Sequence, residues 1–301
     1  MKKGQPSRTA AYMALFRALE TTRPASQRLF SDPYAAAFLS PGLRTLVVLS
    51  RVPPLGNAIR AAIDRRWTGV RTSAVARTKY FDDAILSALG EDGEVRQVVL
   101  LGAGYDARAY RMPELAALDV FEVDHPDTSA AKQKAMAARS PALSSHVQFV
   151  PVEFGVQSLQ AAMAMAGFSP ERRTIVVWEG VTNYLGAEAV DATLRWCATL
   201  AAGSLLLFTY VHQRLFDAPK AYDGTERLFA ALARAGEKWT FGLDPVETRG
   251  FLARRGLVLV DDQGATELRA RCYGKGAMHM TGYEFYRAAI ARVAPKPASR
   301  G

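Results

Sequence analysis

The sequence is poor in the residues that form disulfide scaffolds or bind structural metals. Only two cysteines, Cys197 and Cys272, occur in 301 residues, and no CxxC pair is present. Their wide separation excludes a disulfide scaffold and a four-cysteine zinc site, and we interpret both as reduced thiols of a cytoplasmic enzyme. The four histidines show no HExxH or other zinc spacing, so we predict that the protein holds no metal.

Long hydrophobic runs are also missing. No apolar run approaches the roughly 18 residues that a membrane-spanning helix needs, so we expect no membrane partner. The N-terminal run AAYMALF follows Lys2 and Lys3 and loosely resembles a signal peptide, but Arg17 and Glu20 come after it instead of a small-residue cleavage site. An amphipathic helix is therefore the better interpretation.

Positive charge is concentrated in one segment. The net charge is +9, and residues 44–79 contain eight basic side chains against a single acidic one, Asp64. A local basic patch beside a pocket suits a small acidic substrate, although a solvated helix face explains it equally well. A nucleic-acid groove is expected to add aromatic rings for base stacking, and this segment contains only Trp67, so we expect no nucleic-acid partner.

The distribution of apolar residues divides the chain in two. The first part is mainly helical, with a long amphipathic helix over 72–90 that stops at Gly90. From residue 96 onward, short apolar runs alternate with helical patterns, which predicts a doubly wound, largely parallel sheet. We therefore predict a helical cap over 1–95 and an α/β core over 96–301. The expected strands are 98–102, 118–124, 147–152, 174–180, 204–211 and 257–262, with a last segment, 277–294, returning antiparallel along the sheet edge.

A glycine-rich turn follows the first expected strand. In LGAGYDARAY, Gly102 and Gly104 let the backbone turn tightly and approach a ligand closely. Asp124 ends the next strand, 20 residues after Gly104, where it can accept hydrogen bonds from a ribose. These residues predict a nucleoside-bearing cofactor. Together with Ala107 they also satisfy the nicotinamide pattern GxGxxA, so dinucleotide and S-adenosyl-L-methionine binding both stay open, and a purely structural turn is the weakest interpretation.

Two further features favour S-adenosyl-L-methionine. A nicotinamide domain commonly starts close to its first strand, whereas here a helical leader comes first that can form a lid. In VVWEGVTNYL, Glu179 lies at the expected carboxyl edge of the sheet, where ligands of open α/β sheets bind. A carboxylate at that edge can pair with the cationic amino group of a methionine moiety.

Several blocks of the sequence carry a resemblance to a known family. They include ARTKYFDDAI, VVLLGAGYDARAYRM, FEVDHP, VPVEF, WEGVTNYL and FGLDPVETRGFLARRG, and they span most of the chain. Their order and spacing resemble the leucine carboxyl methyltransferase family, in particular its bacterial branch acting on small molecules. The resemblance implies a class I methyltransferase (Rossmann-like) fold, with a doubly wound seven-stranded sheet and an N-terminal helical cap. It also implies S-adenosyl-L-methionine as cofactor and S-adenosyl-L-homocysteine as product.

The resemblance also implies cofactor contacts at particular positions. Arg77 matches the arginine that holds the carboxylate of the cofactor, and Glu179 matches the acid that contacts its methionine end. Gly102 matches the glycine of the cofactor loop, and Asp124 matches the ribose-binding acid.

Beside the adenine, the resemblance places Glu153 and Phe154. The family commonly has Asp-Leu at this pair, so Glu-Phe is a departure. A glutamate can still accept a hydrogen bond from the adenine amino group, with a longer side chain.

The reaction implied is direct displacement at a sulfonium methyl, which chiefly requires alignment of the nucleophile, the methyl carbon and the sulfur. A carboxylate acceptor needs no base at neutral pH, whereas a hydroxyl of high pKa does. His212 follows the fifth expected strand and is the candidate for a substrate role. Tyr210 and Tyr184 are candidates for shaping the acceptor pocket.

The sequence determines neither the acceptor nor the oligomeric state. We predict an O-methyltransferase that modifies a carboxylate or a hydroxyl of a small acidic metabolite, such as a polyketide-like compound. The alternatives are a NAD(P)-dependent oxidoreductase that uses the same glycine loop, and a catalytically inactive binding protein of methyltransferase fold.

Overall fold

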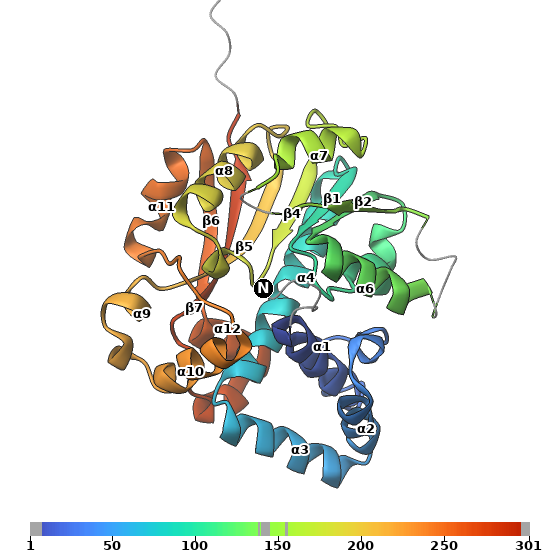
Figure 1. Ribbon diagram of the computed structural model, residues 1–301, viewed down its shortest axis with the longest axis vertical. Coiled ribbons are helices and arrows are strands. Elements are labelled where there is room, and N and C mark those ends of the chain that lie inside the picture. Colours follow the sequence, from blue (N-terminus) through green and yellow to red (C-terminus); the bar gives the residue numbers. More distant parts are fainter. Residues whose placement is uncertain (1–7, 138, 140–144, 154–155, 296–301) are drawn as a thin grey trace, which may run out of the picture.

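A seven-stranded sheet in the order β3-β2-β1-β4-β5-β7-β6 forms the centre of the protein (Figure 1). The computed structural model describes residues 8–137, 139, 145–153 and 156–295. Strands β1 to β5 are parallel, and β7 runs antiparallel to both of its neighbours. The predicted seven-stranded, doubly wound α/β fold is confirmed. The strands are β1 (Gln97–Leu101), β2 (Asp119–Asp124), β3 (Val147–Pro151), β4 (Thr174–Trp178), β5 (Leu205–Val211), β6 (Leu257–Gly264) and β7 (Tyr286–Val293).

The last strand, β7, departs from its expected position at the sheet edge. It lies between β5 and β6, so the prediction of an edge strand is wrong. Ala288, Ala289 and Ala291 are fully buried, and small apolar side chains on both faces suit an interior strand. The edge is formed by β6 instead, where Val258 is 50% exposed and Val260 is 48% exposed.

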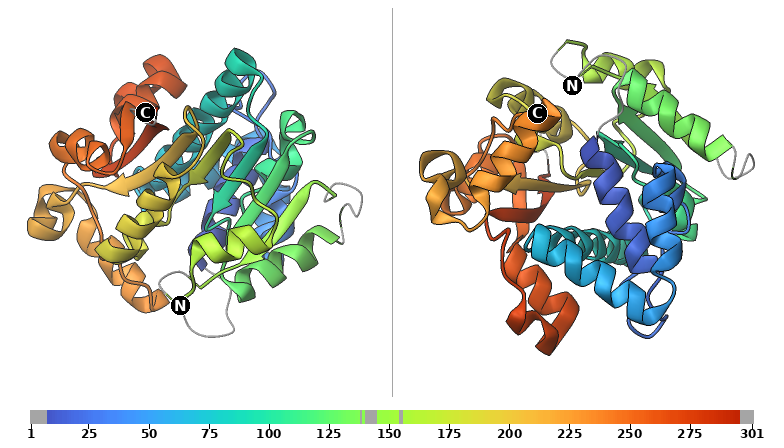
Figure 2. Two further views of the ribbon diagram at one scale, coloured as in Figure 1. Left: turned by 90° about the horizontal axis from the view of Figure 1, so that it is seen from above. Right: turned by 60° about the horizontal axis from the view of Figure 1, so that its bottom comes forward.

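Helices cover both faces of the sheet and produce three layers (Figure 2). Each face of the sheet packs against its own set of helices, which are given at the end of this paragraph. On one face the apolar core includes Val98 and Leu100 of β1, and on the other face it includes Val99 and Leu101. Successive residues of a strand therefore enter opposite cores, as the pleat of a strand requires. The first set is α1 (Arg8–Thr21), α4 (Val70–Asp92), α6 (Pro126–Ala137) and α12 (Ala265–Tyr273), and the second is α7 (Leu159–Met165), α8 (Ala187–Ala198) and α11 (Pro245–Ala253).

The N-terminal helices share an apolar core with the sheet. Leu15 and Leu19 of α1 and Phe81 of α4 belong to the same cluster of buried side chains as Val98 and Ile175. The division into a cap over 1–95 and a core over 96–301 stays a prediction, because the packing is continuous across that boundary.

The remaining elements are short helices and connecting helices outside these two sets. They are η1 (Ala35–Phe38), α2 (Pro41–Leu49), α3 (Pro53–Arg66), α5 (Arg108–Arg111), η2 (Pro113–Leu115), η4 (Thr182–Tyr184), α9 (Arg214–Asp217), η5 (Pro219–Ala221), α10 (Thr225–Ala235) and η6 (Gly274–His279).

The ends of the N-terminal helices follow from proline and glycine. Helices α2 and α3 begin at Pro41 and Pro53, because the fixed φ of proline suits the first helical position. Helix α4 continues through Gly90, so the predicted stop there is wrong. It ends at Asp92, and the next residue, Gly93, has a φ of 56°, the left-handed conformation that commonly closes a helix.

The two cysteine thiols are free, with Cys197 buried and Cys272 half-buried. Within the described part of the chain, no three His, Cys, Asp or Glu residues gather in a way that could hold a metal ion. Nor does any helix of that part have the length and apolar character needed to cross a membrane.

A buried ion pair joins strand β2 to helix α6. Lys132 Nζ lies 2.8 Å from Glu122 Oε2, and both side chains are almost completely buried. The same ammonium group donates a hydrogen bond to the carbonyl of Asp106, in the turn after β1. Burial raises the pKa of Glu122 to about 7, although the charge of Lys132 opposes the shift. Lys132 therefore ties the central sheet, a covering helix and the glycine-rich turn together.

We expect Lys132→Met to lower the free energy of unfolding by about 3–5 kcal/mol near neutral pH and above, because Glu122 loses its cation inside the protein. A carboxyl whose pKa is raised by folding stabilises the folded state at low pH, and this contribution is lost as the pH rises through about 7. The loss in the variant should therefore be smaller in mildly acidic buffer than in mildly alkaline buffer. Urea unfolding in both buffers measures the difference.

Lys134→Met provides the matched control, since Lys134 is exposed on the same helix. It should change the free energy of unfolding by less than about 0.5 kcal/mol. Equal losses for Lys132→Met in the two buffers would contradict the assignment of Glu122 as the buried titrating group.

Candidate active site

A cavity of about 600 Å³ lies where β1, β2 and β4 end. Its wall combines the turn after β1, the residues that follow β2 and β4, the inner side of α1 and α4, and the segment 236–240. Ligands of open α/β sheets bind beyond the carboxyl ends of the strands, so this is the expected place for a cofactor.

The glycine-rich turn approaches the residues after β4 closely. Gly102 and Gly104 have φ values of 63° and 47°, in the left-handed region that favours glycine. A Cβ on Gly102 would lie 2.5 Å from Cγ2 of Val181, so a larger residue does not fit without movement. The turn therefore requires glycine at 102 for both conformation and space.

Asp124, at the end of β2, holds this turn in place. Its carboxylate accepts hydrogen bonds from the backbone N–H of Gly104 and, at 2.6 Å, from that of His125. Burial raises the pKa of Asp124, while these two hydrogen bonds oppose the shift. Asp124 lines the cavity, where its oxygens keep lone pairs for a ribose hydroxyl.

Opposite charges meet at the end of β4. Glu179 lies 2.8 Å from Arg77 Nε through one oxygen and 2.8 Å from Arg108 Nη1 through the other. Burial alone would raise the pKa of Glu179, but Arg108 and Arg77 hold it below its usual value. Arg77 and Glu179 thus present a cation and an anion side by side. This arrangement is complementary to an amino-acid zwitterion, whose ammonium and carboxylate groups are bonded to one carbon.

Arg108 positions this pair from below the turn. It is 2% exposed and binds Asp82 of α4 at 2.7 Å, Asp106 of the turn and Glu179. Asp106 and Arg108 follow the glycine-rich turn, and their ion pair connects this turn to Asp82 and Glu179. Both also reach the cavity wall.

The pair expected beside the adenine is only partly described. Glu153 is exposed at the rim of the cavity, and its backbone N–H donates to Gln157 Oε1 at 2.9 Å. Phe154 lies outside the described residues.

Tyr184 is the one predicted acceptor-side residue that the structure places in the cavity wall. Tyr210 is completely buried on the other side of β5, where its hydroxyl donates to Asp262 at 2.6 Å. The preceding residue, Thr209, accepts a hydrogen bond from the backbone N–H of Gly180, which lines the cavity. Alternation along β5 therefore turns Tyr210 away, contrary to the expectation that it shapes the pocket.

His212 is also outside the cavity wall, contrary to expectation. It follows β5 at the correct edge of the sheet, but its Nδ1 accepts a hydrogen bond from the backbone N–H of Arg214 at 3.1 Å. Burial lowers its pKa. The ring therefore helps to form the local turn.

Besides Tyr105 of the glycine-rich turn, three aromatic residues of the cavity wall were not identified from the sequence. Trp239, Tyr283 and Tyr286 line the cavity together with Tyr184. The Arg77 guanidinium carbon lies 4.8 Å from the centre of the Tyr286 ring. TGYEFY shows strand-like character only, and the loop that contains Trp239 shows no motif, so no pattern marked these positions.

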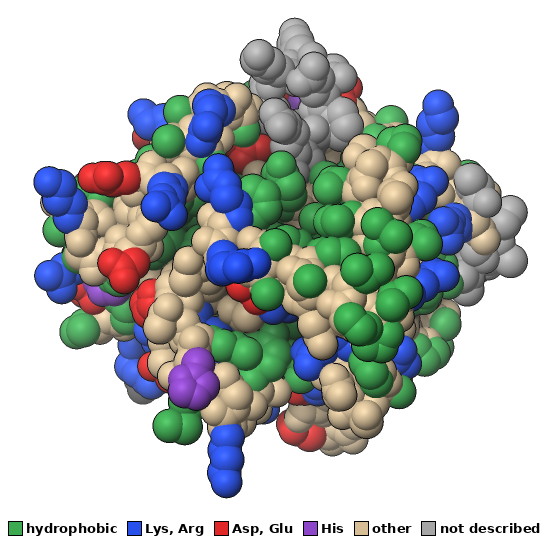
Figure 3. Space-filling model, turned by 90° about the horizontal axis from the view of Figure 1, so that it is seen from below, with side chains coloured by type: hydrophobic (Ala, Val, Ile, Leu, Met, Phe, Trp, Pro, Cys, Tyr) green, Lys and Arg blue, Asp and Glu red, His purple; other side chains and the backbone are tan. Residues whose placement is uncertain are grey.

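The basic segment 44–79 does not face the cavity as a whole. Of its eight basic residues only Arg77 lines the wall, and it is paired with Glu179. Arg71 pairs with Asp64 at 2.5 Å, within the segment. On the face seen from below, Lys and Arg side chains are spread among hydrophobic side chains and do not form one continuous basic patch (Figure 3). The expectation that this segment provides a positive surface for the acceptor is therefore wrong apart from Arg77.

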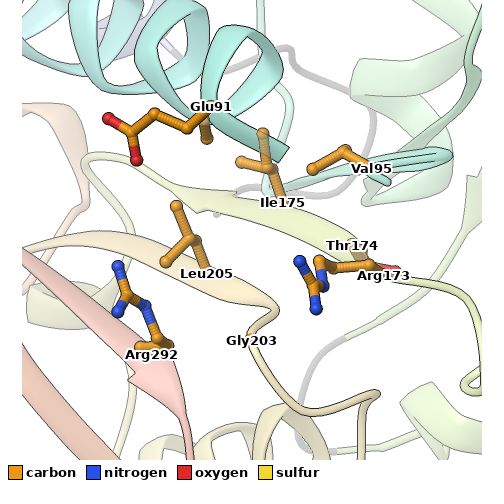
Figure 4. Close-up of a pocket in the computed structure, with 9 residues that line it drawn as sticks. Glu91, Val95, Arg173, Thr174, Ile175, Gly203, Leu205 and Arg292 are labelled. Carbon is orange, nitrogen blue, oxygen red and sulfur yellow. The ribbon is translucent and has the colours of Figure 1, made fainter. Parts of the chain in front are cut away.

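A second, smaller pocket of about 350 Å³ lies at the opposite ends of β4 and β5 (Figure 4). Glu91 of α4, Arg173 and Arg292 surround it. Arg173 also pairs with Glu94 at 2.8 Å. The two pockets share no lining residue, so the smaller one has no direct contact with the expected cofactor site.

Comparison with other sequences places the chain among methyltransferases. The family model of leucine carboxyl methyltransferase matches residues 10–198. A protein of Frankia alni, provisionally named an S-adenosyl-L-methionine-dependent methyltransferase, is 39% identical over 207 residues, which are 67% of each chain. A Streptomyces avermitilis protein with the same provisional name is 35% identical over 272 residues, covering 89% of this chain and 87% of its own.

Solved structures show a similar fold. The structure of a Thermobifida fusca protein that is provisionally named a methyltransferase superposes with a TM-score of 0.56 at 16% identity, covering 92% of this chain and 97% of that one. A protein of the duf574 family from Streptomyces avermitilis gives a TM-score of 0.54 at 16% identity, covering 92% and 100%. Because the family model spans more than half of the sequence, the chain belongs to the leucine carboxyl methyltransferase family.

Proposed function

We propose that this protein is an S-adenosyl-L-methionine-dependent O-methyltransferase with a small-molecule acceptor. The observation that carries the proposal is the Arg77–Glu179 pair at the end of β4, set between the glycine-rich turn and the aromatic part of one cavity. The pair suits the zwitterionic end of the cofactor, Asp124 suits its ribose, and the missing side chain of Gly102 leaves room for close approach. Family membership favours this function over a NAD(P)-dependent oxidoreductase.

When bound, the cofactor supplies a methyl group on a positively charged sulfur, which an oxygen nucleophile can displace. The residues of the protein then have to bind, orient and exclude water. Arg77, Glu179 and Asp124 would hold the two polar ends of the cofactor, and the buried side chains around them would keep solvent away from the sulfur. Arg108 acts as a positioning residue, since it holds both Glu179 and Asp106.

The acceptor would occupy the aromatic part of the cavity. A carboxylate acceptor gives a methyl ester and a hydroxyl acceptor gives an ether. Transfer of a labelled methyl group into the small molecules of a cell extract tests the reaction, and loss of the label in base identifies an ester. Binding of the cofactor without transfer to any acceptor would favour an inactive binding protein.

Glu179→Gln should weaken binding of S-adenosyl-L-homocysteine at least tenfold, about 1.4 kcal/mol, because the amino group of the ligand loses its counter-charge. Isothermal titration calorimetry measures the affinity, and the unmodified protein should not bind NAD. Glu188→Gln is the control, since Glu188 is exposed in the first turn of α8. Normal binding by Glu179→Gln, or tight binding of NAD, would refute the site assignment.

Gly102→Ala should also weaken binding of S-adenosyl-L-homocysteine at least tenfold, because the methyl group meets Val181 and the left-handed backbone disfavours alanine. Gly186→Ala is the matched control: a Cβ there meets no atom within 4 Å, and its φ of −72° suits any residue. Calorimetry on both variants decides the point, and equal affinities would show that the turn does not approach the ligand.

A further inference from the structure

Four aromatic rings form a distinct part of the cavity wall, which we call the aromatic compartment: Tyr184, Trp239, Tyr283 and Tyr286. The Trp239 ring centre lies 6.0 Å from that of Tyr184 and 6.3 Å from that of Tyr286, in edge-to-face arrangements. Tyr283 and Tyr286 stack with centres 5.7 Å apart. Flat rings at these spacings favour a planar ligand, which can stack on their faces or meet their edges.

The backbone at Tyr283 is strained. Its φ of 67° is left-handed, and it is the one non-glycine residue with positive φ in the described part of the chain. The adjacent Gly282 packs on Thr68, where a Cβ would lie 2.5 Å from the carbonyl oxygen, and Arg269 donates a hydrogen bond to the Gly282 carbonyl. Surrounding contacts thus hold an unfavourable conformation that brings a tyrosine to the cavity wall. Such strain is typical of ligand-binding positions.

The compartment contains buried polar atoms without a well-aligned hydrogen bond. The Tyr184 hydroxyl faces Thr9 and Trp239, but neither this hydroxyl nor Trp239 Nε1 forms a hydrogen bond of normal geometry, and the side-chain amide of Asn183 is also buried without one. Buried polar groups without partners are rare in proteins, so these atoms are candidates for bonding to a ligand. They offer hydroxyl and N–H donors of zero net charge.

The buried cations of the cavity wall are already paired. Arg17 binds Asp32 at 2.8 Å, Arg77 binds Glu179, and Arg108 binds Asp82, Asp106 and Glu179. Lys238 also lines the cavity, but it is exposed to solvent. No buried cation among the described lining residues is therefore left over for an acceptor carboxylate, and burying an anion without one is costly.

One carboxylate lies within the aromatic compartment. Glu237 precedes Trp239 by two residues, and its Oε2 accepts a hydrogen bond from Thr9 Oγ1 of α1 at 2.7 Å. Glu237 and Tyr184 line the same cavity, and the charge of Glu237 adds to the effect of burial in raising the pKa of Tyr184. The other carboxylates of the described wall belong to the turn after β1, end β2, or follow β3 and β4.

We propose that the acceptor is an uncharged aromatic compound with a phenolic hydroxyl, bound in the aromatic compartment, and that Glu237 takes its proton. This rests on the methyl transfer proposed above. The O–H proton moves to the Glu237 carboxylate, the oxygen forms the new bond to the methyl carbon, and the pair of electrons of the broken C–S bond stays on sulfur. The products are an aryl methyl ether, a neutral thioether and a protonated Glu237, which releases its proton to water.

Matched ligands test the acceptor class by binding alone. With S-adenosyl-L-homocysteine present at saturation, 2-naphthol should bind at least tenfold more tightly than 2-naphthoate at neutral pH, as measured by calorimetry and by quenching of tryptophan fluorescence. The two probes share a ring system and differ in charge. Equal or tighter binding of 2-naphthoate, or binding of neither probe by protein that binds S-adenosyl-L-homocysteine, would overturn the acceptor class and leave the proposed function standing. Failure to bind S-adenosyl-L-homocysteine would remove the proposed function instead.

Tyr283→Gly removes one ring of the compartment. Glycine accepts the left-handed backbone, which offsets part of the packing that the ring loses against Phe285 and Tyr286. Affinity for 2-naphthol should fall at least tenfold, and affinity for S-adenosyl-L-homocysteine should stay within threefold. Unchanged affinity for 2-naphthol would show that the ligand does not contact this ring.

Glu237→Gln tests the proton transfer. With 2-naphthol as acceptor, kcat at neutral pH should fall at least tenfold while KM stays within threefold, and the rate should recover as the pH approaches the pKa of the hydroxyl, about 10 for a phenol. Glu226→Gln, at an exposed position in the first turn of α10, is the control. A variant with an unchanged rate and pH profile, or no transfer by the unmodified protein to bound 2-naphthol, would overturn the role of Glu237.

Discussion

The site depends on one buried arginine. Arg108 is almost fully enclosed, yet it contacts three carboxylates from separate parts of the chain: Asp82 on α4, Asp106 in the turn after β1, and Glu179 after β4. The planar guanidinium group can satisfy several carboxylates in fixed directions, which a lysine cannot do. Because an unpaired charge is costly in the interior, these three elements have to stay together. The N-terminal helical region and the sheet are thereby joined at the place where the cavity forms.

The same principle explains why the proposed cofactor side of the cavity is already organised in the structure without a ligand. Asp124 already holds the backbone of the glycine-rich turn, and Lys132 holds it from the opposite side through the Asp106 carbonyl. Without a ligand, the charges of Glu179 and Arg77 neutralise each other. A ligand that carries one positive and one negative group could take over part of this pairing, as the proposed function requires. A site that is ordered in advance loses less conformational entropy on binding.

The proposed acceptor side, the aromatic compartment, is built differently. Its wall is mainly aromatic and comes from segments far apart in the sequence, including η4, the 236–240 loop and the residues just before and within β7. The Thr9–Glu237 hydrogen bond joins α1 to the 236–240 loop across this region, so the first helix and a late loop enclose the cavity together. Under the proposed function, rigid rings in such a wall would select a ligand by shape, and the paired charges nearby would give no advantage to an anion.

The sequence by itself determined the alternating pattern of the sheet, the glycine-rich turn, and the positions of Asp124, Glu179 and Tyr184, because these depend on local spacing and on strand ends. It did not reveal that β7 lies inside the sheet. Nor did it show that Tyr210 and His212 lie outside the cavity wall, since these placements depend on strand pairing and on hydrogen bonds with distant residues. Only the tertiary structure brought Trp239, Tyr283 and Tyr286 beside Tyr184, because packing between separate segments leaves no periodic signal in any one of them.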